Sequence, residues 1–154
     1  MTSPRWVAYD TLRAVHDSDA YANLLLPREI AKAGLSGPDA ALATELAYGT
    51  LRRQGTYDAV IADAAGRGVD EIDPPVLDAL RLGVHQLLSM RVPSHAAVNE
   101  TVRQVRKSSG SGASGFANAV LRRVSERSSE DWLERLDTIA RSDDERLALR
   151  HAHP

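Results

Sequence analysis

Cysteine is absent from the 154 residues of this chain. Without a thiol, the chain forms no disulfide, no thiolate metal site and no cysteine nucleophile. Aromatic residues are also scarce, at 5% of the sequence, and no apolar run is long enough to cross a bilayer. The first residues lack the charged-then-apolar layout of a signal peptide. We therefore expect a cytoplasmic protein with no membrane partner.

Alanine and leucine are abundant, and the composition of 43% hydrophobic and 26% charged residues is typical of a folded domain. Both residues lose little free energy on entering a helix, whereas β-branched and aromatic residues lose more. Apolar residues recur at three- and four-residue spacings, and no stretch of useful length alternates as a strand would. The sequence predicts an all-α fold, of a length that suits one ordinary domain.

Capping residues predict where the helices begin and end. Ser3-Pro4 and Asp73-Pro74-Pro75 have the form of helix starts, and Gly66 has the form of a stop. Ser36, followed three residues later by an acid, matches a capping box. Three further features are predicted from composition: a break at Gly55, a flexible loop over residues 108–115, and a last helix starting at Ser142.

The sequence shows no catalytic constellation. The letters G-x-G-x-x-G occur at Gly110–Gly115, but they follow an amphipathic helix instead of a strand, so we interpret them as a surface loop. His151 and His153 supply only two ligands at a chain end, which is too few for a metal site. His85 lies beside an apolar stripe and is interpreted as a hydrogen-bonded histidine that is either buried or at the edge of the core. We predict no catalytic residue, no bound cofactor and no metal.

Polar residues interrupt the apolar pattern of two predicted helices, and two roles are possible for them. Asn99, Glu100 and Asn118 either hydrogen-bond backbone between helices or contact a ligand. The structural role is favoured, because buried amides are usually paired in this way.

The net charge of −2 conceals a basic segment. Residues 1–80 carry a balance of −5, residues 81–127 one of +6, and residues 128–154 one of −3. A local excess of cations suits a phosphate backbone, although a solvated helix face has the same composition. Helical spacing groups the candidate cations on shared faces. The candidate RNA-binding residues are Arg103, Arg106, Lys107, Arg122, Arg123 and Arg127, with Arg52 and Arg53 as weaker candidates.

Three segments carry a resemblance to a known family: Glu45-Leu-Ala-Tyr-Gly-Thr-Leu-Arg52, Ala97-Val-Asn-Glu-Thr-Val102 and Gly115-Phe-Ala-Asn-Ala-Val-Leu-Arg-Arg123. Together they resemble the NusB-like family. The resemblance implies an all-α fold of two small helical subdomains in an orthogonal bundle, with C-terminal linker helices, and it implies RNA binding. The ending Asn-Ala-Val-Leu-Arg-Arg is more similar to the version fused to ribosomal RNA cytosine-5 methyltransferases than to the free antitermination factor.

This resemblance implies a division of the chain. Residues 1–127 are expected to form a non-catalytic RNA-binding domain, and residues 128–154 a helical linker to a methyltransferase domain outside this chain. That domain would hold S-adenosylmethionine. It would also hold a nucleophilic cysteine, because cytosine-5 methyl transfer resembles chemistry that such a cysteine performs. The expected partners are small-subunit (16S) ribosomal RNA and the methyltransferase domain itself. Two alternatives remain: a protein-interaction scaffold that docks the catalytic domain or a ribosomal protein, and a free antitermination factor.

Overall fold

The computed structural model describes the backbone of residues 2–152 and the side chains of residues 2–145 and 147. Within this range the chain is helical and contains no strand, so the predicted all-α class is confirmed. In chain order the elements are α1 (Pro4–Ser18), α2 (Ala22–Lys32), α3 (Gly37–Arg52), α4 (Gln54–Ala65), the short 3-10 helix η1 (Val69–Glu71), α5 (Pro74–Ser89), α6 (Ser94–Ser109), α7 (Ser111–Ser125) and α8 (Ser129–Ala152).

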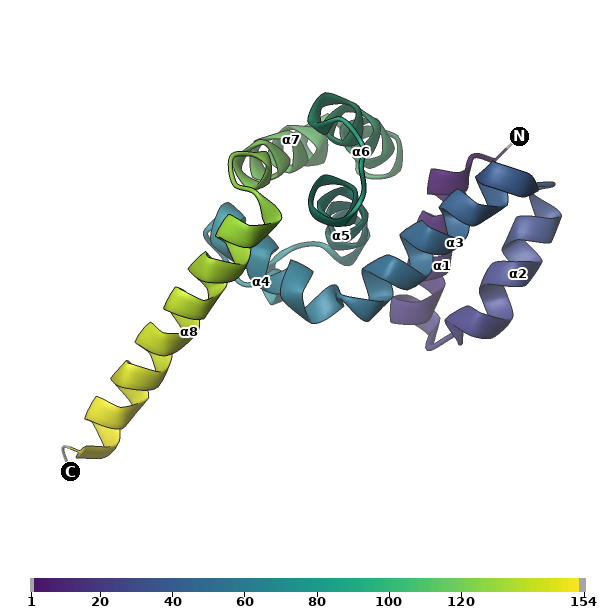
Figure 1. Ribbon diagram of the computed structural model, residues 1–154. Helices are drawn as coiled ribbons and strands as arrows, with labels where there is room; N and C mark the ends of the chain where they lie inside the picture. Colours follow the sequence, from purple (N-terminus) through teal and green to yellow (C-terminus); the bar gives the residue numbers. More distant parts are fainter. Residues whose placement is uncertain (1, 153–154) are drawn as a thin grey trace.

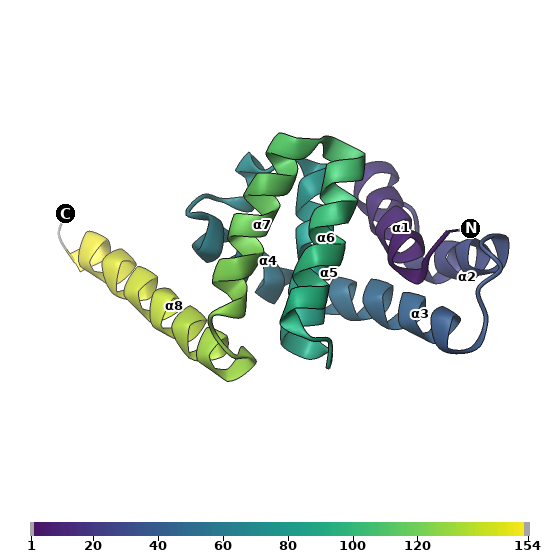
Figure 2. The ribbon, with the colours of Figure 1, turned by 90° about the horizontal axis from the view of Figure 1, so that it is seen from above.

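The helices form two bundles, as the family resemblance implies. Helices α1, α2 and α3 pack on one another, and α4, α5, α6 and α7 form the second group (Figure 1). Helix α5 contacts both α1 and α3 and so joins the two bundles. Helix α8 starts against α4 and then extends away from the body, so that the C-terminal end lies far from the N-terminus (Figures 1 and 2).

Several predicted helix ends are confirmed. The Ser3 side chain accepts a hydrogen bond from the backbone N–H of Trp6 at 3.3 Å, and Pro4 occupies the first turn of α1. Proline also opens α5. Gly66 ends α4 with a φ of 69°, in the left-handed region that a glycine adopts without strain.

Three predicted boundaries are wrong. Residues 108–115 form no flexible loop, because only Gly110 separates α6 from α7. Small residues permit this tight turn: Ser114 is buried, and its hydroxyl donates back to the carbonyl of Ser111 at 2.8 Å. Gly55 lies inside α4 instead of breaking a helix, and Ser142 lies inside a continuous α8. The predicted linker helices are therefore a single helix.

A buried ion network fastens the two bundles together. The carboxylate of Asp78 on α5 accepts hydrogen bonds from Arg13 at 2.8 Å and Arg81 at 3.0 Å, and lies 2.7 Å from the Nδ1 atom of His16. Arg81 also donates twice to Asp58 on α4, at 2.7 and 2.9 Å. Burial alone raises the pKa of Asp78, but the bonds from His16, Arg13 and Arg81 outweigh it and lower that pKa.

His85 is hydrogen-bonded, as the sequence predicts, and it is completely buried. Its Nδ1 atom lies 2.6 Å from the Tyr57 hydroxyl, and its Nε2 atom lies 3.0 Å from the Glu45 carboxylate. Burial lowers the pKa of His85, which favours the neutral ring. The ring fits against α3 because Gly49 leaves space there: a Cβ atom at Gly49 would lie 2.5 Å from the Cε1 and Nε2 atoms of His85.

We expect Gly49→Ala to destabilise the fold by about 1–3 kcal/mol, because the new methyl group overlaps the buried ring. Urea unfolding measures the change. Gly55→Ala is the matched control, because Gly55 also lies in a helix and a Cβ atom added there would meet nothing within 4 Å. That variant should be neutral or more stable by up to about 1 kcal/mol. Equal effects at both sites would contradict the steric explanation.

Candidate nucleic-acid interface

The predicted cations are all exposed and fall into three groups along the chain. Arg103, Arg106 and Lys107 occupy the C-terminal half of α6, and we call them the α6 patch. Helix α7 runs back beside α6, which places the other predicted arginines toward the opposite end of the pair. Arg122, Arg123 and Arg127 form this α7 patch, and Arg52 and Arg53 lie at the α3–α4 junction. The α6 patch and the α7 patch therefore lie toward opposite ends of the helix pair.

The α6 patch lies beside α1. The ammonium of Lys107 lies 5.7 Å from the centre of the Trp6 ring, and both residues line a cavity with Thr2 and Asp10. The side-chain amide of Gln104 donates to the carbonyl of Arg5 at 3.0 Å, which fixes α6 against α1. Trp6 is only partly buried, so an aromatic surface accompanies the cations. Cations and a stacking surface together suit a nucleic-acid backbone with unpaired bases.

The α7 patch is held in place by neighbouring groups. Arg123 donates to the carbonyl of Ala64 on α4 at 2.8 Å, and Arg122 donates to the side chain of Asn118 at 3.2 Å. The guanidinium of Arg127 lies 5.5 Å from the centre of the Trp132 ring. These contacts restrict the guanidinium groups, which reduces the entropy that they lose on binding an anion.

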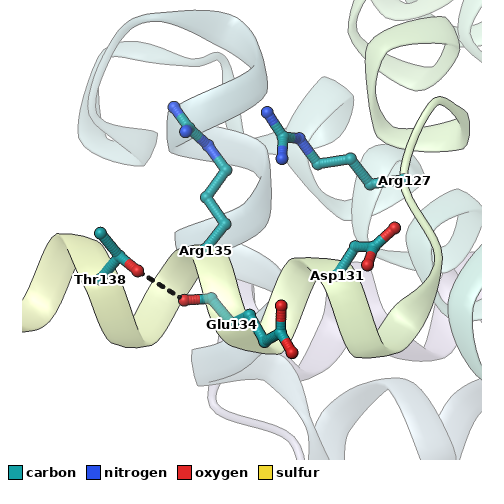
Figure 3. Close-up of a pocket in the computed structure, with 5 residues that line it drawn as sticks. All are labelled: Arg127, Asp131, Glu134, Arg135 and Thr138. Atoms are coloured by element: carbon teal, nitrogen blue, oxygen red, sulfur yellow. Dashed lines mark hydrogen bonds between the residues drawn. The ribbon is translucent and has the colours of Figure 1, made fainter.

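Arg135 is a neighbour of this patch that is not predicted from the sequence. It donates twice to Asp63 on α4, at 2.6 and 3.0 Å, and so ties α8 to α4. Arg127 and Arg135 line one cavity, and Figure 3 shows their guanidinium groups on the same side of α8. Asp131 and Glu134 line the same cavity, with the Glu134 carboxylate directed away from the arginines in the view of Figure 3. No motif marks Arg135, because only the fold brings it to Asp63.

Most of the predicted cations differ from several other arginines of the chain in having no carboxylate partner among the described residues. Among the residues that the structure describes, only Arg103 of the predicted set forms an ion pair, at 3.5 Å to Glu100. The remaining seven have no carboxylate within ion-pair distance in this part of the chain. By contrast, four arginines whose side chains the structure describes pair with aspartate: Arg13, Arg81, Arg135 and Arg141. The predicted cations therefore keep their charge available for an external anion.

The structural role predicted for the asparagines is wrong. Asn99 is exposed, and Asn118 bonds Arg122 within the same helix instead of bridging two helices. Glu100 pairs with Arg103 on α6. These polar residues lie at the edge of the buried helix face, and helical periodicity alone does not distinguish that edge from the core.

Among the described residues, no group of three or more metal-ligating side chains is found. Within the same part of the chain, no helix has the length and apolar character required to cross a bilayer. The side chain of His151 and all of His153 lie outside the described residues, so the interpretation of these two histidines stays a prediction.

The fold defines the class of this protein: an all-helical domain of two bundles with unpaired cations on its surface. The chain belongs to the NusB family, whose family model matches residues 2–126. Among solved structures, a crystal structure of the antitermination factors NusB and NusE in complex with dsRNA contains a similar chain. That chain is 22% identical to this one, and the two superpose with a TM-score of 0.72 over 80% of this chain and 93% of that chain. At this identity the likeness shows the shared fold.

Curated relatives extend the comparison over almost the whole chain. A Mycobacterium tuberculosis protein provisionally named a methyltransferase is 50% identical over 97% of this chain and 33% of its own length. Ribosomal RNA small subunit methyltransferase B of Pseudomonas putida is 35% identical over 99% of this chain and 33% of its own length. A probable enzyme of the same name in Bacillus subtilis is 30% identical over 99% and 33%. This chain thus spans about a third of these relatives and matches their N-terminal part.

Proposed function

We propose that this chain is the non-catalytic RNA-binding domain of an S-adenosylmethionine-dependent methyltransferase that acts on cytosine-5 of small-subunit (16S) ribosomal RNA. In this proposal residues 1–127 contact the RNA. Residues 128–154 connect them to a catalytic domain, which holds the S-adenosylmethionine. The matched relatives support the proposal, because several are named ribosomal RNA small subunit methyltransferases and are about three times longer than this chain.

The observation that carries RNA contact is the set of surface cations without carboxylate partners. Seven of the eight predicted residues lack an ion pair in the described part of the chain, in a protein whose net charge is −2. Guanidinium groups bind phosphates through paired N–H donors without reading the base sequence. The domain is therefore expected to position the RNA, while the choice of nucleotide belongs to the catalytic part.

Fluorescence anisotropy of labelled ribosomal RNA hairpins, titrated with this domain at several salt concentrations, tests the proposal. Each neutralised phosphate adds about −0.7 (single strand) to −0.9 (duplex) to the slope of log affinity against log salt. Three or more contacts therefore predict a slope steeper than about −2. An unrelated hairpin serves as the comparison for targeting. Binding that does not change with salt would refute phosphate contact.

A second candidate function is a protein-interaction scaffold that docks the catalytic domain or a ribosomal protein. One observation favours it: α8 projects from the body and leaves Leu147 50% exposed (Figure 1). Absence of RNA binding even at low salt would support this candidate over the first.

A further inference from the structure

We propose that one face of α8 is the docking surface for the catalytic domain, and that α8 thereby holds that domain in a fixed position against the bundles. This inference rests on the proposed function, since it assumes that a catalytic domain follows α8. The surface consists of the apolar side chains of Leu133, Leu136, Ala140 and Leu147, and we call it the α8 face. Their spacings of three, four and seven residues place them on one side of the helix.

Helix α8 is apolar on two sides, and the described part of the chain covers only one of them. Trp132 is buried against the body, where its ring N–H donates to the carbonyl of Val124 at 2.8 Å. By contrast, Leu133 is 60% exposed and Leu147 is 50% exposed. Single exposed apolar residues are normal on a protein surface, but a row of them along one helix marks an interaction surface.

The projecting end of α8 needs such a partner. The helix extends beyond the bundles (Figures 1 and 2), and residues 141–145 and 147 are all exposed. Helices in proteins owe most of their stability to the packing of an apolar face, and a short helix alone is marginal in water. A partner that covers Leu147 would therefore stabilise the projecting turns.

Two hollows beside α4 extend the α8 face, and Leu136 lines both of them. The first, between α4, α5 and the start of α8, has a volume of about 220 Å³, and its accessible wall is aliphatic with one arginine, Arg53. The second has a volume of about 340 Å³ and is lined by aliphatic side chains and two aspartates, Asp63 and Asp143. Side chains that project from a protein surface can enter both hollows.

The charge of α8 decides between possible occupants. Residues 129–147 contain seven acidic residues and three arginines, a balance of −4. Glu130, Asp137 and Asp144 are exposed, and each precedes a residue of the α8 face by three positions, so an acidic row runs beside the apolar one. Only Asp137 of these three forms an ion pair in the described part of the chain, at 3.1 Å to Arg141.

This acidic row argues against two occupants. It repels the phosphates of RNA, and it repels the identical row on a second copy of the chain. The surface that fits the α8 face is therefore a protein surface that is apolar at its centre and basic at its edge.

The small size of the α8 face favours a partner on the same polypeptide. A stable interface between separate proteins uses about 20–30 residues on each side, whereas the α8 face offers four apolar residues and two hollows. A domain joined to α8 meets this surface at an effective concentration in the millimolar range, so weak contacts are sufficient. In the matched relatives this chain corresponds to the N-terminal third, so about two thirds of their length follows the matched part.

Hydrogen–deuterium exchange followed by mass spectrometry tests the docking. The isolated chain is compared with the full polypeptide, in which the catalytic domain follows it. The backbone amides of residues 137–147 should exchange at least about tenfold more slowly in the full polypeptide, because docking suppresses local opening of the helix. The amides of α2, which lies in the other bundle, should be unchanged (Figure 1). Equal exchange of residues 137–147 in the two proteins overturns the docking surface.

The double variant Leu133→Lys with Leu147→Lys should return the exchange in the full polypeptide to the rate of the isolated chain. Lysine is about as good a helix former as leucine, so this variant removes apolar surface without weakening the helix itself. Tyr21→Lys with Leu24→Lys is the matched control, because these residues are 73% and 58% exposed at the start of α2. The control should keep the slow exchange. Slow exchange that survives the α8 variant contradicts the proposal.

Other occupants give different results in the same measurement. Exchange that slows in the isolated chain as its concentration rises identifies a second copy, and exchange that slows on addition of RNA identifies the nucleic acid. Either result overturns the assignment to the catalytic domain.

The proposed function is judged separately, by methyl transfer from S-adenosylmethionine to small-subunit ribosomal RNA by the full polypeptide. Transfer without slow exchange at α8 overturns only the docking surface. Slow exchange without transfer overturns the proposed function and leaves the docking of a following domain standing.

Discussion

Asp78→Asn should destabilise the domain by roughly 3–5 kcal/mol, because it leaves buried cations without their shared counter-charge. Asp78 is completely buried, and Arg81 is only 7% exposed. Arg13 and His16 reach the same carboxylate from α1, so the substitution also weakens the attachment of one bundle to the other. Urea unfolding followed by circular dichroism measures the change as a shift of the midpoint.

Asp17→Asn is the control for this substitution. Asp17 pairs with the same Arg13, but at 3.7 Å and with its side chain 71% exposed. Exposed pairs contribute little because water screens them, so this variant should lie within about 0.5 kcal/mol of the parent. A similar loss from both variants would show that Arg13 pairing in general, and not burial at Asp78, sustains the fold.

The pH dependence of stability gives a second check on Asp78. Its pKa is lowered in the folded state, so its contribution is complete above the unfolded-state pKa of about 3.9 and disappears as the pH falls through the folded value. The difference in stability between the parent and Asp78→Asn should therefore shrink below about pH 4. A difference that persists at lower pH would contradict the assigned role of the ionised carboxylate.

The fold could be predicted largely from local signals, whereas the network at Asp78 could not. Capping serine and proline fix the starts of α1 and α5 because they act within one turn of their own position. The stretch over residues 108–115 misled the prediction, since small residues serve both flexible loops and tight helix hairpins. Asp78 lies 65 residues from Arg13 and 20 from Asp58, and nothing in the sequence indicates that α5 brings them together.

The candidate site shows the same division between composition and geometry. The excess of cations in residues 81–127 is visible in the sequence, and the six candidate cations chosen from it do lie on the surface. Their separation into two patches follows from the antiparallel course of α6 and α7, which turns on Gly110 alone. Arg135 and the cavity beside Arg53 were not predicted, because both arise where α8 packs on earlier helices.

The double charge reversal Arg106→Glu with Lys107→Glu should weaken binding to a ribosomal RNA hairpin by at least about tenfold at low salt. Loss of two phosphate contacts should also make the slope of log affinity against log salt shallower by about 1.4–1.8. The expectation follows from the position of both residues, exposed on α6, with Lys107 against Trp6 and neither residue paired with a carboxylate in the described part of the chain. Anisotropy at two or more salt concentrations gives both quantities.

Arg28→Glu with Lys32→Glu separates local contact from overall charge. These two residues are exposed on α2, outside every patch described above, and their reversal changes the net charge by the same amount. Long-range repulsion alone falls off beyond about 10 Å at 0.1 M salt, so this control should retain a slope close to that of the parent. If the two double variants weaken binding equally, the RNA responds to net charge and the α6 patch makes no specific contact. If only the α6 variant loses slope, the two cations beside Trp6 contact phosphates directly, and the surface between α1 and α6 is part of the RNA path.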